Sequence, residues 1–103
     1  MVAPLSLSVL WSERADDVVA GRLDLDEERL VLHGGSRDVP RRLEIALTEV
    51  RDVRLARRVR ERLRDRTTLQ IELGDGRLVS VATLASLGAL HELGDRLSSA
   101  ASG

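Results

Sequence analysis

The first apolar residues of the chain alternate with polar ones, a period of two that is typical of a β-strand with one buried face. The side chains that share that face are Leu5, Leu7, Val9 and Trp11. We expect this strand to be a free edge of an open sheet, where a partner or a second copy could add a strand. Trp11 suits either the core or a protein contact, and we favour the core because Trp is highly buried on average.

Period-two alternation resumes after a polar connection and predicts a hairpin. Residues 19–33 form two alternating runs around a tight turn at 26–28, and the second run ends at Gly34-Gly35. Glycine can take positive φ at no steric cost, so this pair is a natural end for a strand. Residues 42–47 alternate again and predict a further strand.

Residues 49–66 fit two structures. As a helix, their apolar residues form a stripe at spacings of three and four, and Arg and Leu are good helix formers. As a strand, the Val and Leu residues at the start are β-compatible, whereas the helix-favouring composition begins only at Ala56. We predict a strand over about residues 50–57, followed by an Arg-rich loop or short helical turn to Arg66.

The clearest hairpin spans residues 67–83, where two alternating runs flank Gly74-Asp75-Gly76, and Asp-Gly is a strong hairpin signal. An apolar stripe then predicts a helix that packs on the sheet, capped by Thr83 or Ser86. The stripe consists of Leu84, Leu87, Leu90, Leu93 and Leu97.

Two glycines lie inside this helix, Gly88 and Gly94, and each costs about 1 kcal/mol relative to Ala. We attribute them to a close approach of the helix to the sheet. Residues 98–103 are only Ser, Ala and Gly, and we expect this tail to be disordered.

Seven strands followed by one amphipathic helix is the order of the pleckstrin-homology (PH) superfamily. The runs VAGRLDL at 19–25, RLVL at 29–32, LEIALTEVRDV at 43–53 and LQIELGDG at 69–76 resemble the bacterial PH-like, GRAM-like group. This resemblance extends over about residues 9 to 98. It implies a mainly β chain, a PH-like split barrel of about seven antiparallel strands capped by the C-terminal helix. It also implies a non-catalytic domain that binds lipid headgroups or proteins.

A chain of 103 residues has room for one domain, residues 1–103, with one core. Cysteine is absent, which excludes disulfides and thiolate sites and fits a cytoplasmic setting. The first apolar run has no preceding basic residue and is too short to span a bilayer, so we expect neither a signal peptide nor a transmembrane helix.

Charge is unevenly distributed along a chain whose net charge is only −1. Residues 13–28 contain seven acids and two Arg, whereas residues 41–66 contain ten Arg and five acids. The candidate sites for an anion or a lipid headgroup are Arg57, Arg58, Arg60, Arg62, Arg64 and Arg66. Guanidinium groups donate paired hydrogen bonds to phosphate, and each basic residue at an anionic membrane contributes about 1 kcal/mol. The competing interpretation is a solvated hairpin, partly neutralised by Glu61, Asp65 and the acidic segment at 13–28.

Other chemistry finds little support in the sequence. His33 and His91 lie far apart without Cys, and the acidic run at 24–28 lacks the spacing of a calcium loop, so we expect neither a metal nor a cofactor. No Gly-x-Ser-x-Gly nucleophile elbow or phosphate loop occurs. Nucleic acid is disfavoured because Trp11 is the only aromatic residue and the chain is slightly acidic.

We therefore expect a PH-like module rather than an enzyme, binding a protein partner or a second copy of itself. The alternative is peripheral binding to anionic phospholipid through the Arg-rich loop at 57–66, which would make the cytoplasmic protein membrane-peripheral. A third class, a small-ligand site in the groove between helix and sheet, has no residue set in the sequence to support it.

Overall fold

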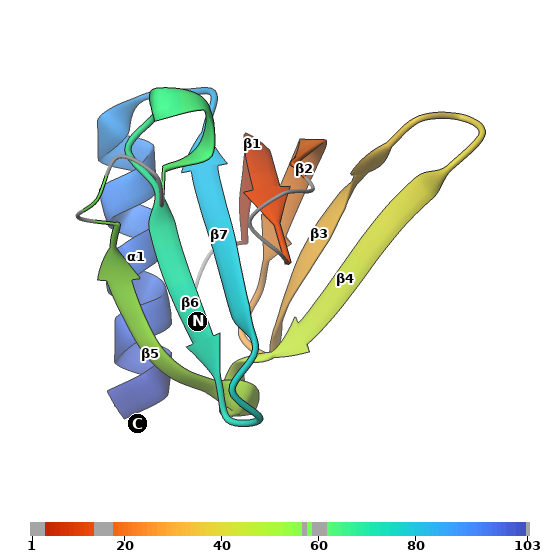
Figure 1. Cartoon of the computed structure of the whole chain (residues 1–103). Coiled ribbons are helices and arrows are strands. Elements are labelled where there is room, and N and C mark those ends of the chain that lie inside the picture. Colours follow the sequence, from red (N-terminus) through yellow and green to blue (C-terminus); the bar gives the residue numbers. More distant parts are fainter. Residues whose placement is uncertain (1–3, 14–17, 57, 59–61, 103) are drawn as a thin grey trace.

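The computed structural model describes residues 4–13, 18–56, 58 and 62–102, over which strands precede a C-terminal helix (Figure 1). The elements are β1 (Leu5–Ser12), β2 (Val19–Leu25), β3 (Arg29–Gly35), β4 (Pro40–Ala46), η1 (Leu47–Glu49), β5 (Val50–Leu55), η3 (Leu63–Asp65), β6 (Leu69–Leu73), β7 (Leu78–Thr83) and α1 (Leu87–Ser102). The expected fold class, about seven antiparallel strands and one C-terminal helix, is confirmed.

The seven strands form one antiparallel sheet in the order β4-β3-β2-β1-β7-β6-β5. The sheet curls into a half-barrel, with α1 packed against the wing made by β5, β6 and β7 (Figure 1). The hairpin of β3 and β4 extends away from this helix (Figure 1). Strands β4 and β5 are the two ends of the sheet, so each has hydrogen-bonded neighbours on one side only.

Strand β1 lies inside the sheet, so the prediction that it forms a free edge is wrong. It pairs with β2 from Leu5 to Trp11, and on its other side Val9 to Ser12 pair with β7. Leu5 and Leu7 extend beyond β7, where the Ser8 carbonyl accepts a hydrogen bond from the Leu84 amide at 2.9 Å. Alternation identifies the buried face of a strand but carries no information about its neighbours, which is why the edge was misassigned.

The core lies between the curled sheet and α1. Two apolar rows cross the wing of β1 to β4 on its inner face, formed by Leu5, Leu25, Leu30 and Ile45 and by Leu7, Leu23, Leu32 and Leu43. From α1, Leu90, Leu93 and Leu97 are fully buried against the same cluster. Trp11 is also buried, as expected.

Ser86, one of the two expected caps, directly precedes α1, and the helix ends later than the pattern predicts. Ser86 accepts a hydrogen bond from the Ala89 amide at 3.2 Å and caps α1, while Leu84 and Leu87 remain exposed. The residues expected to be a disordered tail are helical as far as Ser102. Their Ser and Ala content is compatible with a helix, and the last turns are supported by the packing of the preceding turns.

The two helix glycines differ. A Cβ built on Gly94 would lie 3.4 Å from Leu69 Cδ1, so Gly94 does allow α1 to approach β6 closely. A Cβ on Gly88 would meet only the Ser86 side chain at 3.8 Å, so the expected close approach does not apply there.

The ambiguous segment after η1 begins as a strand. Val50 to Leu55 pair with β6, which excludes one helix over residues 49–66. Further along, η3 places the Leu63 side chain against Leu10 and Ala82 on the outer face of the sheet. Part of the predicted Arg-rich loop, namely Arg57 and residues 59–61, lies outside the described residues.

Candidate functional site

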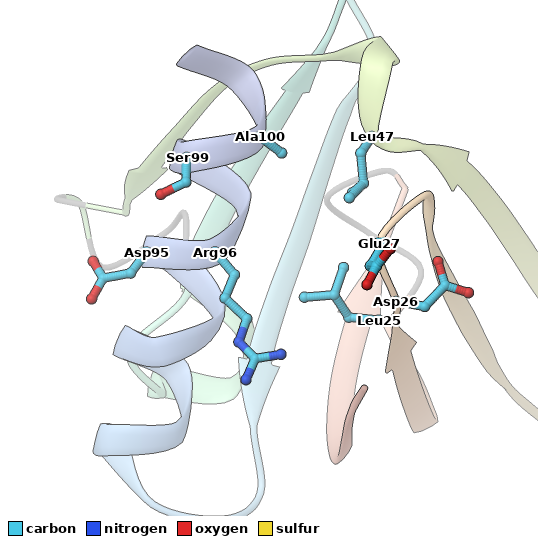
Figure 2. A pocket seen from close by; sticks show the side chains of 8 residues that line it. All are labelled: Leu25, Asp26, Glu27, Leu47, Asp95, Arg96, Ser99 and Ala100. Atoms are coloured by element: carbon cyan, nitrogen blue, oxygen red, sulfur yellow. The ribbon is translucent and has the colours of Figure 1, made fainter. Parts of the chain in front are cut away.

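A groove of about 670 Å³ separates the second half of α1 from the β2–β3 turn and η1 (Figure 2). It is lined by Leu25, Asp26, Glu27, Leu47, Asp95, Arg96, Ser99 and Ala100. Figure 2 shows Leu25, Leu47 and Ala100 pointing into the space between the elements, where they form an apolar floor. The Arg96 side chain extends across from the helix, whereas Asp95 points away from the strands (Figure 2).

Main-chain hydrogen bonds hold the sheet side of the groove in place. The Leu47 amide donates to the Glu28 carbonyl at 2.9 Å and ties η1 to the β2–β3 turn. Within the turn, Asp26 Oδ1 accepts hydrogen bonds from the amides of Glu28 and Arg29 at 2.8 and 2.9 Å. These two amides lower the pKa of Asp26 below its ordinary value, since they bind the ionised carboxylate. The β2–β3 turn and η1 therefore form a side of the groove that is held in place by hydrogen bonds.

The rim of the groove is predominantly acidic. The lining residues include the carboxylates of Asp26, Glu27 and Asp95 and the guanidinium of Arg96. The Asp95 side chain points away from the strands (Figure 2), and Asp26 Oδ1 accepts the amides of its own turn. Arg96 Nη2 lies 3.1 Å from Glu92 Oε1 in an ion pair one helical turn earlier, which offsets its charge. An apolar floor under a negative rim suits a ligand that combines aliphatic and cationic groups.

The predicted anion-binding arginines lie elsewhere. Among those that are described, Arg58, Arg62, Arg64 and Arg66 are exposed. Arg57 and Arg60 lie outside the described residues, so their part of the prediction has no structural counterpart. The loop that carries the other arginines is anchored by Thr68, whose Oγ1 accepts from the Leu63 amide and donates to the Arg66 carbonyl, both at 2.9 Å.

Most other described arginines form ion pairs, whereas the arginines of this loop form none with a described carboxylate. Ion pairs link Arg22 to Asp24, Arg29 and Arg42 to Glu44, and Arg77 to Asp75. Over the described part of residues 51–66, by contrast, no arginine forms an ion pair with a described carboxylate, and Arg54 contacts the neutral Gln70. The expected neutralisation by the acidic segment at 13–28 is therefore not found among the described residues. We call the exposed set Arg51, Arg54, Arg58, Arg62, Arg64 and Arg66 the arginine surface.

A third polar cluster on the outer face of the sheet was not anticipated. Asp24 receives the Ser6 hydroxyl at 2.6 Å and lies 3.1 Å from Arg22 Nε and 3.3 Å from His33 Nε2. The Ser6 hydrogen bond and the Arg22 charge lower the pKa of Asp24. The Ser6 hydroxyl thus donates to a carboxylate rather than to an imidazole, so the cluster lacks the nucleophile–base contact of a hydrolase. It is the cross-strand polar network of a solvated sheet face.

Sequence analysis named a groove between helix and sheet but none of the residues that line it, because these residues are dispersed along the chain. Leu25 ends one strand, Leu47 follows another, and Arg96 and Ala100 lie four residues apart on the helix. The spacing of the last two predicts a shared helix face, but no local pattern shows what that face meets. The edge residues Leu5, Leu7, Val9 and Trp11 line neither the groove nor a free strand.

Two other kinds of feature, a metal-binding cluster and a membrane-spanning helix, are not found in the described residues. No three His, Asp or Glu side chains among them are grouped so that they could hold a metal ion. Nor does any helix within the described ranges have the length and apolarity needed to cross a bilayer.

No protein-family model and no curated protein matches this chain. A similar solved structure is the crystal structure of the C-terminal domain of an unknown protein from Leishmania infantum, with 14% sequence identity and a TM-score of 0.69. The match covers 90% of this chain and 81% of that chain. At this identity the likeness shows a shared fold alone.

Proposed function

We propose that this chain is a non-catalytic, PH-like protein-interaction module that binds its partner in the groove between α1 and the β2–β3 turn. The PH-like assignment is supported by the strand order that ends in a capping helix, together with the hairpin motifs at 19–32 and 69–76. Because fold does not determine function, the proposal depends on the groove itself.

The observation that carries the proposal is an apolar floor bordered by carboxylates beside a free strand edge. Leu47 directly follows β4, whose outer edge has no strand neighbour in the described sheet. An extended segment can pair with such an edge and place alternate side chains in an adjoining pocket. The acidic rim favours a cationic segment whose aliphatic side chains contact Leu25, Leu47 and Ala100.

A small polar ligand is less well supported by the same groove. Sites for such ligands present a few polar groups that converge on the bound molecule. In the described residues, every buried side-chain nitrogen or oxygen already has a hydrogen-bond partner. The floor consequently offers aliphatic contact but no unsatisfied buried group to orient a polar molecule.

Two synthetic peptides test this function. Both carry leucine at alternate positions, with arginine between the leucines in one and glutamate in the other, and their affinities are measured by isothermal titration calorimetry. We expect only the arginine peptide to bind. Ala100→Trp fills the floor of the groove and should weaken binding at least about tenfold, which is about 1.4 kcal/mol.

The matched control is Ser98→Trp, because Ser98 is exposed on the same helical turns and does not line the groove. It should bind as wild type does. Equal affinity for both peptides, or equal loss in both Trp variants, would refute the proposed site.

A second candidate function is peripheral binding to anionic phospholipid through the arginine surface. It is favoured because these exposed guanidinium groups, which suit phosphate, have no carboxylate partner within the described part of the chain. Co-sedimentation with vesicles of phosphatidylcholine alone, or mixed with phosphatidylserine, tests it at low salt. We expect Arg58→Glu with Arg62→Glu to abolish any preference for the anionic vesicles, and Arg37→Glu in the β3–β4 turn to preserve it. Equal sedimentation with both vesicle types would rule out this candidate.

A further inference from the structure

We propose that the occupant of the groove is the arginine surface of a second copy of this chain, so that molecules associate head to tail. The inference deepens the proposed function and depends on it, since it names the partner for the same groove. It rests on the complementary chemistry of two surfaces that one molecule carries at separate places.

In this arrangement the arginine surface is the donor surface, the one that enters the groove of the next copy. It combines positive charge with an exposed aliphatic side chain. Arg51, Arg54 and Arg58 have no described carboxylate partner. Between Arg54 and Arg58, Leu55 is 41% exposed at the end of β5, although its partner Leu69 in β6 is buried. Beyond it, η3 displays Arg62, Arg64 and Arg66, and the burial of Leu63 and Thr68 fixes the loop that carries them.

The groove is the acceptor surface, and its charge is opposite to that of the arginine surface. Its floor of Leu25, Leu47 and Ala100 can receive an aliphatic side chain, and the carboxylates of Asp26 and Glu27 stand beside it on the turn. Opposite charges around an apolar contact favour encounter and orientation and exclude like-charged surfaces. A second copy of this chain is therefore a partner with complementary charge and a matching apolar contact.

The η3 part of the arginine surface lies at the opposite end of the molecule from the groove, whereas Arg51 closely follows η1 at the groove end of β5. Figure 1 shows η3 and the start of α1 at one end of the half-barrel, and η1 with the β2–β3 turn at the other. A contact between two different surfaces leaves one of each free in every dimer. Association is thus open-ended, giving dimers and longer species as concentration rises, unless the rotation between copies closes a ring.

Sedimentation-velocity ultracentrifugation of the full chain tests this arrangement over a concentration series. At about 20 mM salt we expect a weight-average mass above the 11.3 kDa of one chain, rising with concentration. At about 500 mM salt the mass should return to that of the monomer, because screening weakens exposed charge pairs. Ala100→Trp blocks the acceptor and Arg58→Gln with Arg62→Gln weakens the donor, so each variant alone should be monomeric.

The decisive measurement is an equimolar mixture of these two variants. One retains a working donor and the other a working acceptor, so the mixture should form a dimer and nothing larger. Ser98→Trp and Arg37→Gln are the matched controls and should assemble like wild type. Circular dichroism verifies that each variant is folded, and Glu27→Gln replaces Ala100→Trp if the larger substitution disturbs α1.

The outcomes separate this inference from the proposed function. A wild-type chain that stays monomeric at low salt and high concentration overturns head-to-tail association, while selective binding of the arginine peptide would leave the groove's function intact. A variant mixture that stays monomeric also overturns the arrangement, whereas a wild-type dimer that never grows would indicate a closed two-membered ring. Loss of both self-association and peptide binding would remove the groove as an interaction site.

Discussion

The indole N–H of Trp11 donates a hydrogen bond to the main-chain carbonyl of His33 across an intervening strand, with an N···O distance of 2.9 Å. Trp11 belongs to β1 and His33 to β3, and β2 lies between them in the sheet. Near this bond Gly21 and Gly34 face each other, and β2 and β3 lie too close there to leave room for a Cβ at Gly21. The hydrogen bond connects a buried core side chain of β1 to the main chain of β3 in the curled part of the sheet.

Replacing Trp11 with Phe keeps an aromatic ring but removes this donor. The His33 carbonyl would then lose a partner in a partly buried position, so we expect the free energy of unfolding to fall by about 1–3 kcal/mol. Urea denaturation followed by circular dichroism measures the change, since the variant has no tryptophan fluorescence. A fall below about 0.5 kcal/mol would show that the hydrogen bond contributes little.

Gly21→Ala should be far more destabilising than a typical surface substitution. A Cβ at this position would lie 1.8 Å from the His33 carbonyl oxygen, so β2 and β3 would have to separate. We expect a loss of about 3 kcal/mol or more, seen as a lower melting temperature. Gly74→Ala is the control, because its Cβ would lie 3.8 Å from the Glu49 carbonyl oxygen and should change stability by about 0.5 kcal/mol or less.

Leu63→Ala tests whether one buried leucine holds the loop of the arginine surface against the sheet. Leu63 is 4% exposed and packs on Leu10 and Ala82, so truncation should cost about 2 kcal/mol. Hydrogen exchange should show faster exchange of the Leu63 amide, which donates to Thr68 Oγ1. Leu87→Ala, at a 53% exposed residue, should leave stability and this exchange rate nearly unchanged. Equal effects in the two variants would contradict the anchoring role.

Acid should destabilise the fold through carboxylates held in turns and cross-strand networks. The pKa values of Asp24, Asp26 and Asp75 are lowered from 3.8, mainly by hydrogen bonds from Ser6, Glu28 and Arg77 respectively. A lowered folded-state pKa means that the stabilisation is present above 3.8 and is lost as pH falls through the lower folded-state value. We expect the free energy of unfolding to decrease as pH falls below about 4.

The control for this pH dependence is Asp26→Asn combined with Asp75→Asn. The amide oxygens can still accept the main-chain hydrogen bonds of the turns, but they do not titrate. The doubly substituted chain should therefore lose stability less steeply over the same acidic range. Identical slopes would show that these two carboxylates do not contribute to the acid response.

The local pattern of apolar and polar residues was sufficient to predict much of the secondary structure. Period-two alternation identified the strands, and Gly74-Asp75-Gly76 identified the most secure hairpin, because these signals act between near neighbours. Capping by Ser86 was also predictable, since a serine hydroxyl satisfies an amide only a few residues away. The stripe also included Leu84, which continues its spacing but lies before the helix and is exposed.

What tertiary structure alone decided is which surfaces meet. Alternation shows that β1 has a buried face, but only the folded sheet places it between β2 and β7. The groove joins Leu25, Leu47 and Ala100, whose separation along the chain leaves no local trace of their contact. The sequence by itself determined the elements and the uneven charge, because both depend on residue type and short spacing. The curl of the sheet and the packing of α1 determined where that charge lies and what it adjoins, because those depend on contacts between distant residues.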